Sequence, residues 1–315
     1  MILNVTLKQL RAAASLRKNG SVTRAAHDLG VSPPAVTLQL QALNDQLGMK
    51  LVERSATGMT LTQAGNAVAD AAAKIEAILR ECEALLAALN GAERGEVSVG
   101  IISTAKYYAP QALAAFAQAH PGVELRLSVG NRDEIIRGLE QHELDIAIMG
   151  RPPADLNVIA DVIGDHPHVI IARPDHRLAS QKRIKPQALN GELMLVREVG
   201  SGTRRLMEDY FAEEHITPRM GMNISSNETI KQSVIAGLGI AFISAHTIDA
   251  EVKSGRLAVL DIIGLPIVRQ WHAVHLAQRA MMPASGALLN FLRDRGPIFL
   301  PQFPPSLPAS ESLKA

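Results

Sequence analysis

The first 62 residues contain three short stretches in which apolar residues recur at helical spacing. The first stretch follows Thr6, a residue type that caps helices, and stops at Gly20. The second follows Ser21, has apolar residues at positions i, i+3, i+4 and i+7, and ends at Gly30. Because a cap opens each stretch and a glycine closes it, the pattern predicts separate short helices instead of one long helix.

A doubled proline opens the third stretch. Ser32 is predicted to cap this helix, and Pro33 takes the first helical position, where a missing N–H breaks no hydrogen bond. Leu38 lies on the face that is otherwise polar. The opposite face carries an apolar stripe, which we predict to be buried and which consists of Val36, Leu40, Leu43 and Leu47.

The second and third predicted helices have the arrangement of a helix-turn-helix. In such motifs the exposed face of the second helix enters the major groove, where glutamine bonds adenine and apolar atoms contact the thymine methyl. The alternative is an ordinary three-helix domain in which Leu38 is one of the exposed leucines common on protein surfaces. We predict a DNA-binding face made of Thr23, Ser32, Pro33, Pro34, Ala35, Thr37, Leu38 and Gln41.

Two strand-like pieces, Lys50 to Arg54 and Gly58 to Leu61, follow around a polar turn and predict a wing in which Arg54 meets the phosphate backbone. The charge pattern agrees with this interpretation. Residues 1–62 hold seven Lys/Arg and three acids, whereas the rest of the chain holds 25 basic and 28 acidic residues. A basic head of net charge +4 on a mildly acidic body predicts a polyanionic partner for the head alone.

A long helix is predicted from Thr62 to about Asn90, with apolar residues at both core positions of a seven-residue repeat. Such a stripe also fits a single amphipathic helix that lies on its own domain. Its place directly after a DNA-binding head favours a dimer, which supplies two recognition helices for a two-part operator. The predicted dimer seam consists of Val68, Ala71, Ile75, Ile78, Cys82, Leu85 and Leu89. Residues 91–95, "GAERG", are predicted to form a hinge into the body.

From residue 96 onward, short apolar runs alternate with helical stretches such as 105–119, 132–142, 204–215 and 228–237. This alternation predicts an α/β fold with mainly parallel sheets, in which ligands bind where the strands end and helices begin. Hydroxyl, amide and arginine side chains stand at those predicted ends. Each hydroxyl or amide is also a good helix N-cap, but their repetition at successive strand ends predicts a shared cleft. The predicted cleft residues are Ser103, Thr104, Asn131, Arg132, Arg151, Ser201, Gly202, Thr203 and Asn227.

Composition adds further limits. A chain of 315 residues is expected to form two or three domains, and a single cysteine fits a reducing compartment. The chain opens with no signal-peptide pattern, and its longest apolar run, residues 234–245, is shorter than the ~20 residues of a spanning helix. We therefore expect a cytoplasmic protein with no membrane partner.

Two short motifs suggest enzyme or metal chemistry, but neither is supported by its context. "STAK" at 103–106 has the S-x-x-K spacing of penicillin-binding enzymes without their K-T-G element. "DHPH" at 165–168, taken with His176, fits no standard zinc spacing, and Pro167 predicts a turn that leads into a strand. We therefore predict no enzyme activity, no cofactor and no metal site.

The stretch "SVTRAAHDLGVSPPAVTLQLQALNDQLGMKLVERSATGMTLTQAG" resembles the amino-terminal signature of LysR-type transcriptional regulators. Members of that family commonly carry basic residues at the positions of Leu38 and Gln41 and an acid at Asn44. The resemblance implies a winged helix-turn-helix, a long coiled-coil linker helix and a two-lobed effector domain of the periplasmic-binding-protein type 2. It also implies that the protein binds a DNA operator and forms a homodimer that assembles into tetramers. RNA polymerase is a possible further partner.

Blocks such as "ISTAKYYAP", "LVREVGSGTR" and "ISSNETIKQSVIAGLGIAFISAHT" resemble the CbbR group of this family, which activates carbon-fixation (RuBisCO, Calvin-cycle) operons. This resemblance implies that the small anionic effector is a phosphorylated metabolite or a nucleotide. The alternative is a soluble binding protein or enzyme of periplasmic-binding fold with an incidental helical head. The domains expected are 1–61 for DNA binding, 62–91 for the linker and 92–296 for the effector. Lobe I is expected at about 92–165 and 270–296, lobe II at about 166–269, and a disordered or loosely packed proline-rich tail at 297–315.

Overall fold

The computed structural model describes residues 4–55, 58–89 and 95–302. The chain divides into two compact units, which we call the head unit (Met1–Leu86 with Gln141–Glu143) and the body unit (Ala87–Glu140 with Leu144–Ala315). The predicted hinge at 91–95 lies outside the described residues, apart from Gly95. Within the described ranges, no helix is both long enough and apolar enough to cross a membrane.

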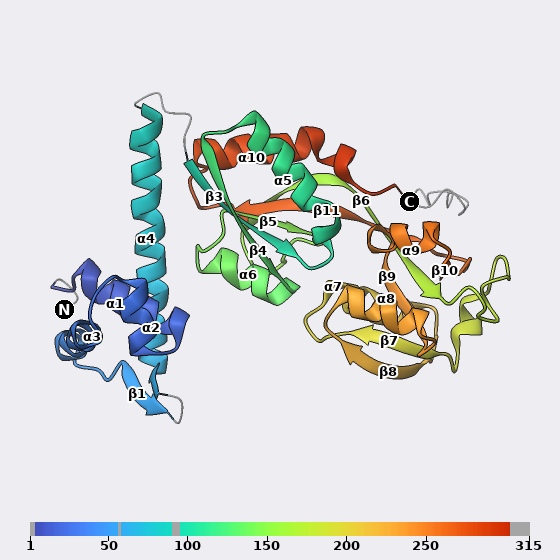
Figure 1. Cartoon of the computed structure of the whole chain (residues 1–315), viewed down its shortest axis with the longest axis horizontal. Coiled ribbons are helices and arrows are strands. Elements are labelled where there is room, and N and C mark those ends of the chain that lie inside the picture. Colours follow the sequence, from blue (N-terminus) through green and yellow to red (C-terminus); the bar gives the residue numbers. More distant parts are fainter. Residues whose placement is uncertain (1–3, 56–57, 90–94, 303–315) are drawn as a thin grey trace. The chain divides into compact units, whose positions relative to one another are not determined.

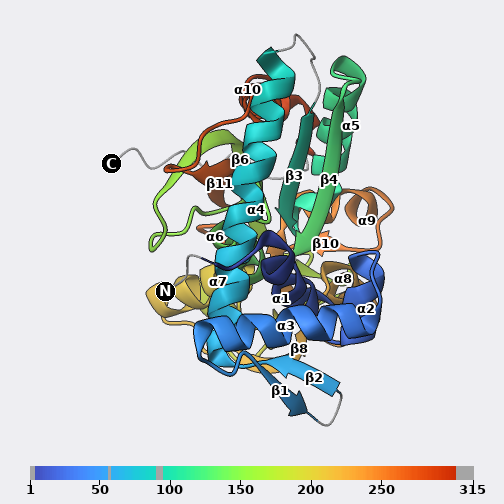
Figure 2. The same ribbon diagram turned by 90° about the vertical axis from the view of Figure 1, so that its left-hand side faces the viewer.

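The head unit opens with three helices, α1 (Leu7–Asn19), α2 (Val22–Asp28) and α3 (Pro33–Leu47) (Figure 2). Thr6 caps α1 as predicted, and a reciprocal bond of 2.7 Å runs from its backbone N–H to the Gln9 side chain. Ser32 stands at the N-cap of α3, but its side chain makes no capping hydrogen bond, contrary to the prediction. Pro33 and Pro34 in the first turn therefore determine where α3 begins.

The three helices enclose a small apolar core, and a ribbon and a long helix complete the unit. The ribbon is the antiparallel pair β1 (Val52–Ser55) and β2 (Gly58–Leu61), and α4 (Gln63–Leu89) leaves the head as one uninterrupted helix (Figure 2). Val68, which we predicted in the dimer seam, is half-buried and packs against the core of the head. Ion pairs from Arg11 and Arg17 on α1 to Glu76 and Asp70 on α4 hold the base of the long helix to the head.

The body unit is built on one nine-stranded sheet with the order β4-β3-β5-β11-β6-β9-β7-β8, while the short β10 pairs with β6 (Figure 1). β3, β4 and β5 are parallel and form what we call lobe I, and β7, β8 and β9 are parallel and form lobe II. The strands are β3 (Gly95–Ile102), β4 (Val123–Gly130), β5 (Ile146–Met149), β6 (Val158–Ala172), β7 (Leu193–Arg197), β8 (Arg219–Ile224), β9 (Ile240–Ser244), β10 (Ala258–Val259) and β11 (Ile267–Leu276).

Helices cover both faces of the sheet. Lobe I carries α5 (Ala109–Ala119), α6 (Arg132–Glu140) and α10 (Pro283–Arg295), and lobe II carries α7 (Gly202–Glu213), α8 (Asn227–Ile235) and α9 (Asp249–Lys253). Short 3-10 turns connect them: η1 (Ala105–Tyr107), η2 (Pro186–Leu189), η3 (Ala245–Thr247) and η4 (Gly296–Phe299). Each lobe thereby buries its own apolar core.

β6 and β11 pass from one lobe to the other and pair antiparallel along their length, from Ile267 opposite His168 to Leu276 opposite Val158. The prediction of mainly parallel sheets therefore holds within each lobe, whereas the crossing strands pair antiparallel. Pro167 also departs from prediction, because it lies inside β6 and not in a turn. A proline is tolerated there because β9, the neighbour on its other side, begins to pair only at His168.

The tail predicted to be loosely packed begins in an ordered way. Residues of η4 and Leu300 pack on the core of lobe I, where Leu300 lies directly over the backbone of Gly164 in β6. The rest of the proline-rich tail, from residue 303, lies outside the described residues.

The start of α4 depends on a close approach of two backbones. A Cβ atom at Gly65 would stand 2.1 Å from the carbonyl oxygen of Leu51, so no larger residue fits unless α4 moves. We expect Gly65→Ala to destabilise the head unit by about 1–3 kcal/mol, the usual effect of overpacking. Calorimetry of the intact chain should show the head transition at lower temperature. Asn66→Ala, an exposed neighbour, is the matched control; equal transitions in the two variants would contradict this account.

Candidate functional site

A cavity of about 550 Å³ opens in the body unit between the strand ends of lobe I and the start of α7 in lobe II. We call it the interlobe cavity. It forms because parallel strands direct their carboxyl ends to one edge, so the segments after β3, β4 and β5 meet there. Eight of the nine predicted cleft residues line it: Ser103, Thr104, Asn131, Arg132, Arg151, Ser201, Gly202 and Thr203.

Asn131, a predicted cleft residue, and Ser226, which precedes the predicted cleft residue Asn227, serve as helix caps. Asn131 accepts a hydrogen bond of 2.9 Å from the backbone of Glu134, whose side chain in turn accepts one of 2.8 Å from the Asn131 N–H. Ser226 caps α8 in the same way, through the backbone N–H of Thr229. The capping alternative therefore holds for these two residues, although Asn131 still lines the interlobe cavity.

The first turn of α7 behaves differently. Ser201 stands at its N-cap without a capping hydrogen bond, and within the described part of the chain the hydroxyls of Ser201 and Thr203 have no hydrogen-bond partner. Both side chains are buried and line the interlobe cavity. Two free hydroxyls beside the N–H groups of a helix start form a surface that suits an anion.

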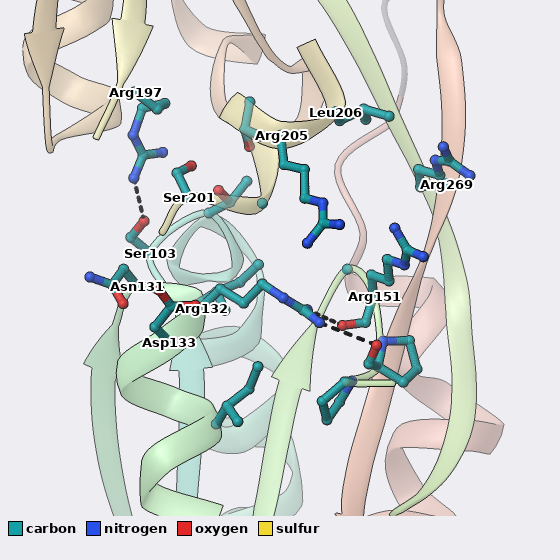
Figure 3. Close-up of a pocket in the computed structure, with 18 of the residues that line it drawn as sticks. Ser103, Asn131, Arg132, Asp133, Arg151, Arg197, Ser201, Arg205, Leu206 and Arg269 are labelled. Carbon is teal, nitrogen blue, oxygen red and sulfur yellow. Dashed lines mark hydrogen bonds between the residues drawn. The ribbon is translucent and has the colours of Figure 1, made fainter. Parts of the chain in front are cut away.

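Arg132 holds the loop after β5 in place. Its guanidinium donates to the backbone carbonyls of Arg151 and, at 3.2 Å, Pro152 (Figure 3). Burial lowers the pKa of Arg132, and the positive charges of Arg151 and Arg205 lower it further, against a smaller opposing effect of Asp133. Neighbouring arginines thus contribute to this shift after burial, and acidic side chains also line the cavity.

Four arginines that line the cavity were missed by sequence analysis: Arg137 in α6, Arg197 in β7, Arg205 in α7 and Arg269 in β11. Arg205 lies one turn beyond Ser201, in the first turn of a predicted helix. That position could have identified it as a cleft residue from the sequence. Arg269 lies on a crossing strand, and only the tertiary structure brings it to this edge. Figure 3 shows Arg205 and Arg151 extending into the same space.

Arg197 is 3% exposed and links the two lobes. It forms a bidentate ion pair with Glu198, with both distances at 2.8 Å, and donates a 3.1 Å hydrogen bond to Ser103 of lobe I (Figure 3). Asn227 belongs to this linkage and does not line the interlobe cavity. Its side-chain oxygen accepts from Arg197, and its amide donates to Thr104 at 3.3 Å.

Two histidines of β6, His166 and His168, form part of the cavity wall. Burial lowers the pKa of His168 to about 3 and that of His166 well below its ordinary value, so both imidazoles are neutral near pH 7. His166 stacks on Trp271 with the ring centroids 3.8 Å apart. The two histidines of the "DHPH" motif thus supply an uncharged part of the cavity wall.

In the head unit, the predicted DNA-binding face of α3 is exposed. Val36, Leu40 and Leu43 are buried, whereas Leu38 on the other face is 64% exposed and only Ala35 of the predicted row is half-buried. The Thr37 hydroxyl donates a 3.1 Å hydrogen bond to the Pro33 carbonyl. Thr23 is exposed on α2, and Arg54 lies in β1, with its side chain outside the described part.

On α4, the remaining predicted seam residues have no apolar cover within the head unit. Ile75 is 36% exposed, Ile78 is 62% exposed, and Ala71 and Cys82 are exposed as well. The side chains of Leu85 and Leu89 lie outside the described part. A row of exposed apolar residues on a long helix is a surface that suits a second helix.

Comparisons with known proteins cover both units. Residues 7–66 match the family "Bacterial regulatory helix-turn-helix protein, lysR family", and residues 90–297 match "LysR substrate binding domain". The chain is 52% identical to the HTH-type transcriptional regulator CbbR of Xanthobacter flavus over 95% of this chain and 90% of that protein. It is 40% identical to the RuBisCO operon transcriptional regulator of Allochromatium vinosum, over 92% and 96% of the two chains.

Two of the similar solved structures bear on the two units. The regulatory domain of CcmR from Synechocystis PCC6803, in complex with 2-PG, is 36% identical with a TM-score of 0.62, over 64% of this chain and 96% of that one. Full-length CbnR in complex with its target DNA is 24% identical with a TM-score of 0.66, over 91% and 99% of the two chains. The second likeness concerns the fold alone.

Proposed function

Because the chain belongs to the family of LysR-type transcriptional regulators, we propose that it controls a carbon-fixation operon in response to a small phosphorylated metabolite. It is a DNA-binding regulator and not an enzyme. The observation that carries this proposal is the identity with CbbR and RuBisCO-operon regulators across both units. Because the identity extends over the head unit as well as the body unit, it argues against the alternative of a binding protein or enzyme whose helical head has no role in DNA binding.

The effector is proposed to occupy the interlobe cavity as an anion. Arg151, Arg205 and Arg269 line it without an ion pair in the described part of the chain, and the helix start at Ser201 adds free donors. Charge-assisted hydrogen bonds from arginine suit phosphate and carboxylate groups. The complex of CcmR with 2-PG, 2-phosphoglycolate, supports a ligand that carries both a phosphate and a carboxylate group.

We expect the effector to act by favouring one arrangement of the two lobes over another. Arg197 and Asn227, which bond Ser103 and Thr104 across the lobes, are placed to differ between such arrangements. The head is proposed to bind operator DNA through α3, and α4 to pair with α4 of a second copy. Assembly into tetramers and contact with RNA polymerase are further expectations.

The first prediction concerns DNA recognition. Gln41→Ala should remove a base contact and reduce affinity at one position of each half-site by about 1–3 kcal/mol. Gln46, exposed on another face of α3, gives the control Gln46→Ala, which should bind as the wild type does. Electrophoretic shift assays with the promoter region of the carbon-fixation operon and single-base variants test both. If Gln41→Ala keeps the base preference unchanged, α3 does not read the operator as proposed.

The second prediction concerns self-association. Replacing both Ile75 and Ile78 with Asp would place unpaired carboxylates in the proposed seam, which costs several kcal/mol on burial. Light scattering should then show loss of the dimer. Asn66→Asp adds a charge to α4 away from the seam and should leave the mass unchanged. A double variant that keeps the wild-type mass would show that the seam lies elsewhere.

The third prediction concerns the effector. Each of Thr203→Ala and Arg205→Ala should weaken binding about tenfold or more, because each removes a donor to a charged ligand. Isothermal titration with 2-phosphoglycolate, phosphoenolpyruvate, sugar phosphates and nucleotides measures this. The control Arg219→Ala removes an exposed arginine of β8 outside the cavity. Unchanged affinity in the two cavity variants would place the effector at another site.

A further inference from the structure

A basic segment, residues 173–185, follows the lobe II end of β6 (Figure 1). It holds five Lys/Arg and one acid, whereas the remaining residues from 63 onward hold 20 Lys/Arg and 27 acids. None of its residues lines the interlobe cavity. The segment therefore concentrates positive charge on a part of the body unit that the effector site does not use.

Neighbouring acids neutralise two of the five cations. Arg173 contacts Asp175 at 2.6 Å, and Arg177 forms an ion pair with Glu192. The other three cations are exposed, and within the described ranges their side chains form no ion pair and no hydrogen bond. We call these three residues the basic cluster: Lys182, Arg183 and Lys185. Their charge is available to a partner outside the chain.

Lobe II fixes the backbone of the basic cluster. Ile184, which lies between Arg183 and Lys185, is 4% exposed and packs in the core of lobe II. Its N–H donates to the Asp261 carbonyl at 2.8 Å, and its carbonyl accepts from the Ile263 N–H at 2.9 Å. Because the backbone is already ordered, a partner that binds here does not have to pay the entropy of ordering it.

The backbone of Arg183 is a second, independent observation. Its φ of 49° lies in the left-handed region, which suits glycine. Among other residue types, asparagine, aspartate and histidine are enriched there, and the other non-glycine residues with positive φ in the described ranges are His142 and His215. An arginine in this region costs backbone free energy that no side-chain contact of Arg183 within the described ranges offsets. Such a cost is expected where a side chain serves a partner and not the fold.

We propose that the basic cluster binds the phosphate backbone of duplex DNA that flanks the operator. Phosphate contacts need positive charge but no match to the base sequence. Three cations bind DNA weakly by themselves, but the head already holds the same DNA molecule, so the second contact forms at a high effective concentration. DNA is favoured over an acidic protein surface because flanking DNA belongs to the same complex. This inference rests on the proposed binding of operator DNA by α3.

The test compares the full-length wild type with a triple variant in which Lys182, Arg183 and Lys185 are all replaced by Gln. The long duplex is the promoter region of the carbon-fixation operon with its flanks, and the short duplex is trimmed to the footprint of the triple variant. Fluorescence anisotropy gives the affinities between about 50 and 200 mM salt, a range over which DNA binding weakens steeply. On the long duplex, the slope of log affinity against log salt should be shallower for the triple variant by about 1–3 per bound chain, since each phosphate contact contributes about 0.9. On the short duplex the two slopes should be equal.

A charge-matched control removes three exposed cations from other elements of the body unit: Lys106→Gln in η1, Lys253→Gln in α9 and Arg293→Gln in α10. This control should keep the wild-type slope on both duplexes. Arg183→Asn separates the backbone from the charge, because asparagine suits the left-handed region. Its unfolding temperature should equal or exceed that of the wild type, while its slope on the long duplex falls by about 1. A lower unfolding temperature would show that Arg183 serves the fold and would contradict its assigned role.

Equal slopes for the wild type and the triple variant on the long duplex overturn the inference, and so does an equal loss in the charge-matched control or on the short duplex. A triple variant that binds both duplexes as the wild type does, but activates transcription less with purified RNA polymerase, would show that the basic cluster binds a protein and not DNA. If the wild type does not prefer the promoter to a random duplex of equal length, the proposed operator is wrong. The basic cluster is still tested on the random duplex in that case, because phosphate contacts do not depend on sequence.

Discussion

The pairing of β6 with β11 is the constraint on which the body unit depends. The two strands are hydrogen-bonded from one lobe into the other, with a single shift in register between Trp271 and His272. β6 contributes Ile163 to the core of lobe I and Ile170 to the core of lobe II. Because each end of the same strand is fixed in a different core, the lobes cannot separate freely. Relative motion is limited to bending of the short stretch between those residues.

This constraint explains the geometry on which the proposed preference of the interlobe cavity for an anion depends. Arg132 is bound to carbonyls of its own lobe, and Arg197 is neutralised by Glu198, so neither is mobile. Arg151, Arg205 and Arg269 remain exposed around them and come from segments that only the crossing strands bring together. Imidazoles that form part of the cavity wall are neutral, because burial makes a charged histidine unfavourable there.

Local chemistry explains what the sequence could predict. Thr6, Ser21 and Ser226 cap helices because a cap acts on the backbone of its own helix, and the strand ends follow from the alternation of patterns. Pro167 was misjudged because its acceptance in β6 depends on where β9 begins to pair. Arg269 and the contact of Trp271 with His246 could not be predicted, because they join segments far apart in the chain. Asn227 was placed in the right region, but at the start of α8 it bonds Arg197 of β7 and does not line the cavity.

The return of β11 to lobe I also has a consequence for synthesis on the ribosome. β3 begins at Gly95, but lobe I remains incomplete until β11 and α10 have been made. The residues of lobe II lie in the sequence almost entirely between β5 and β11. At about 5–20 residues per second, the first strands of lobe I wait roughly 10–40 s for their last partner. During that interval the apolar edge of β5, which later pairs with β11, is exposed to other chains. Lobe II is therefore expected to be the first part of the body to become compact, and lobe I the last to be completed.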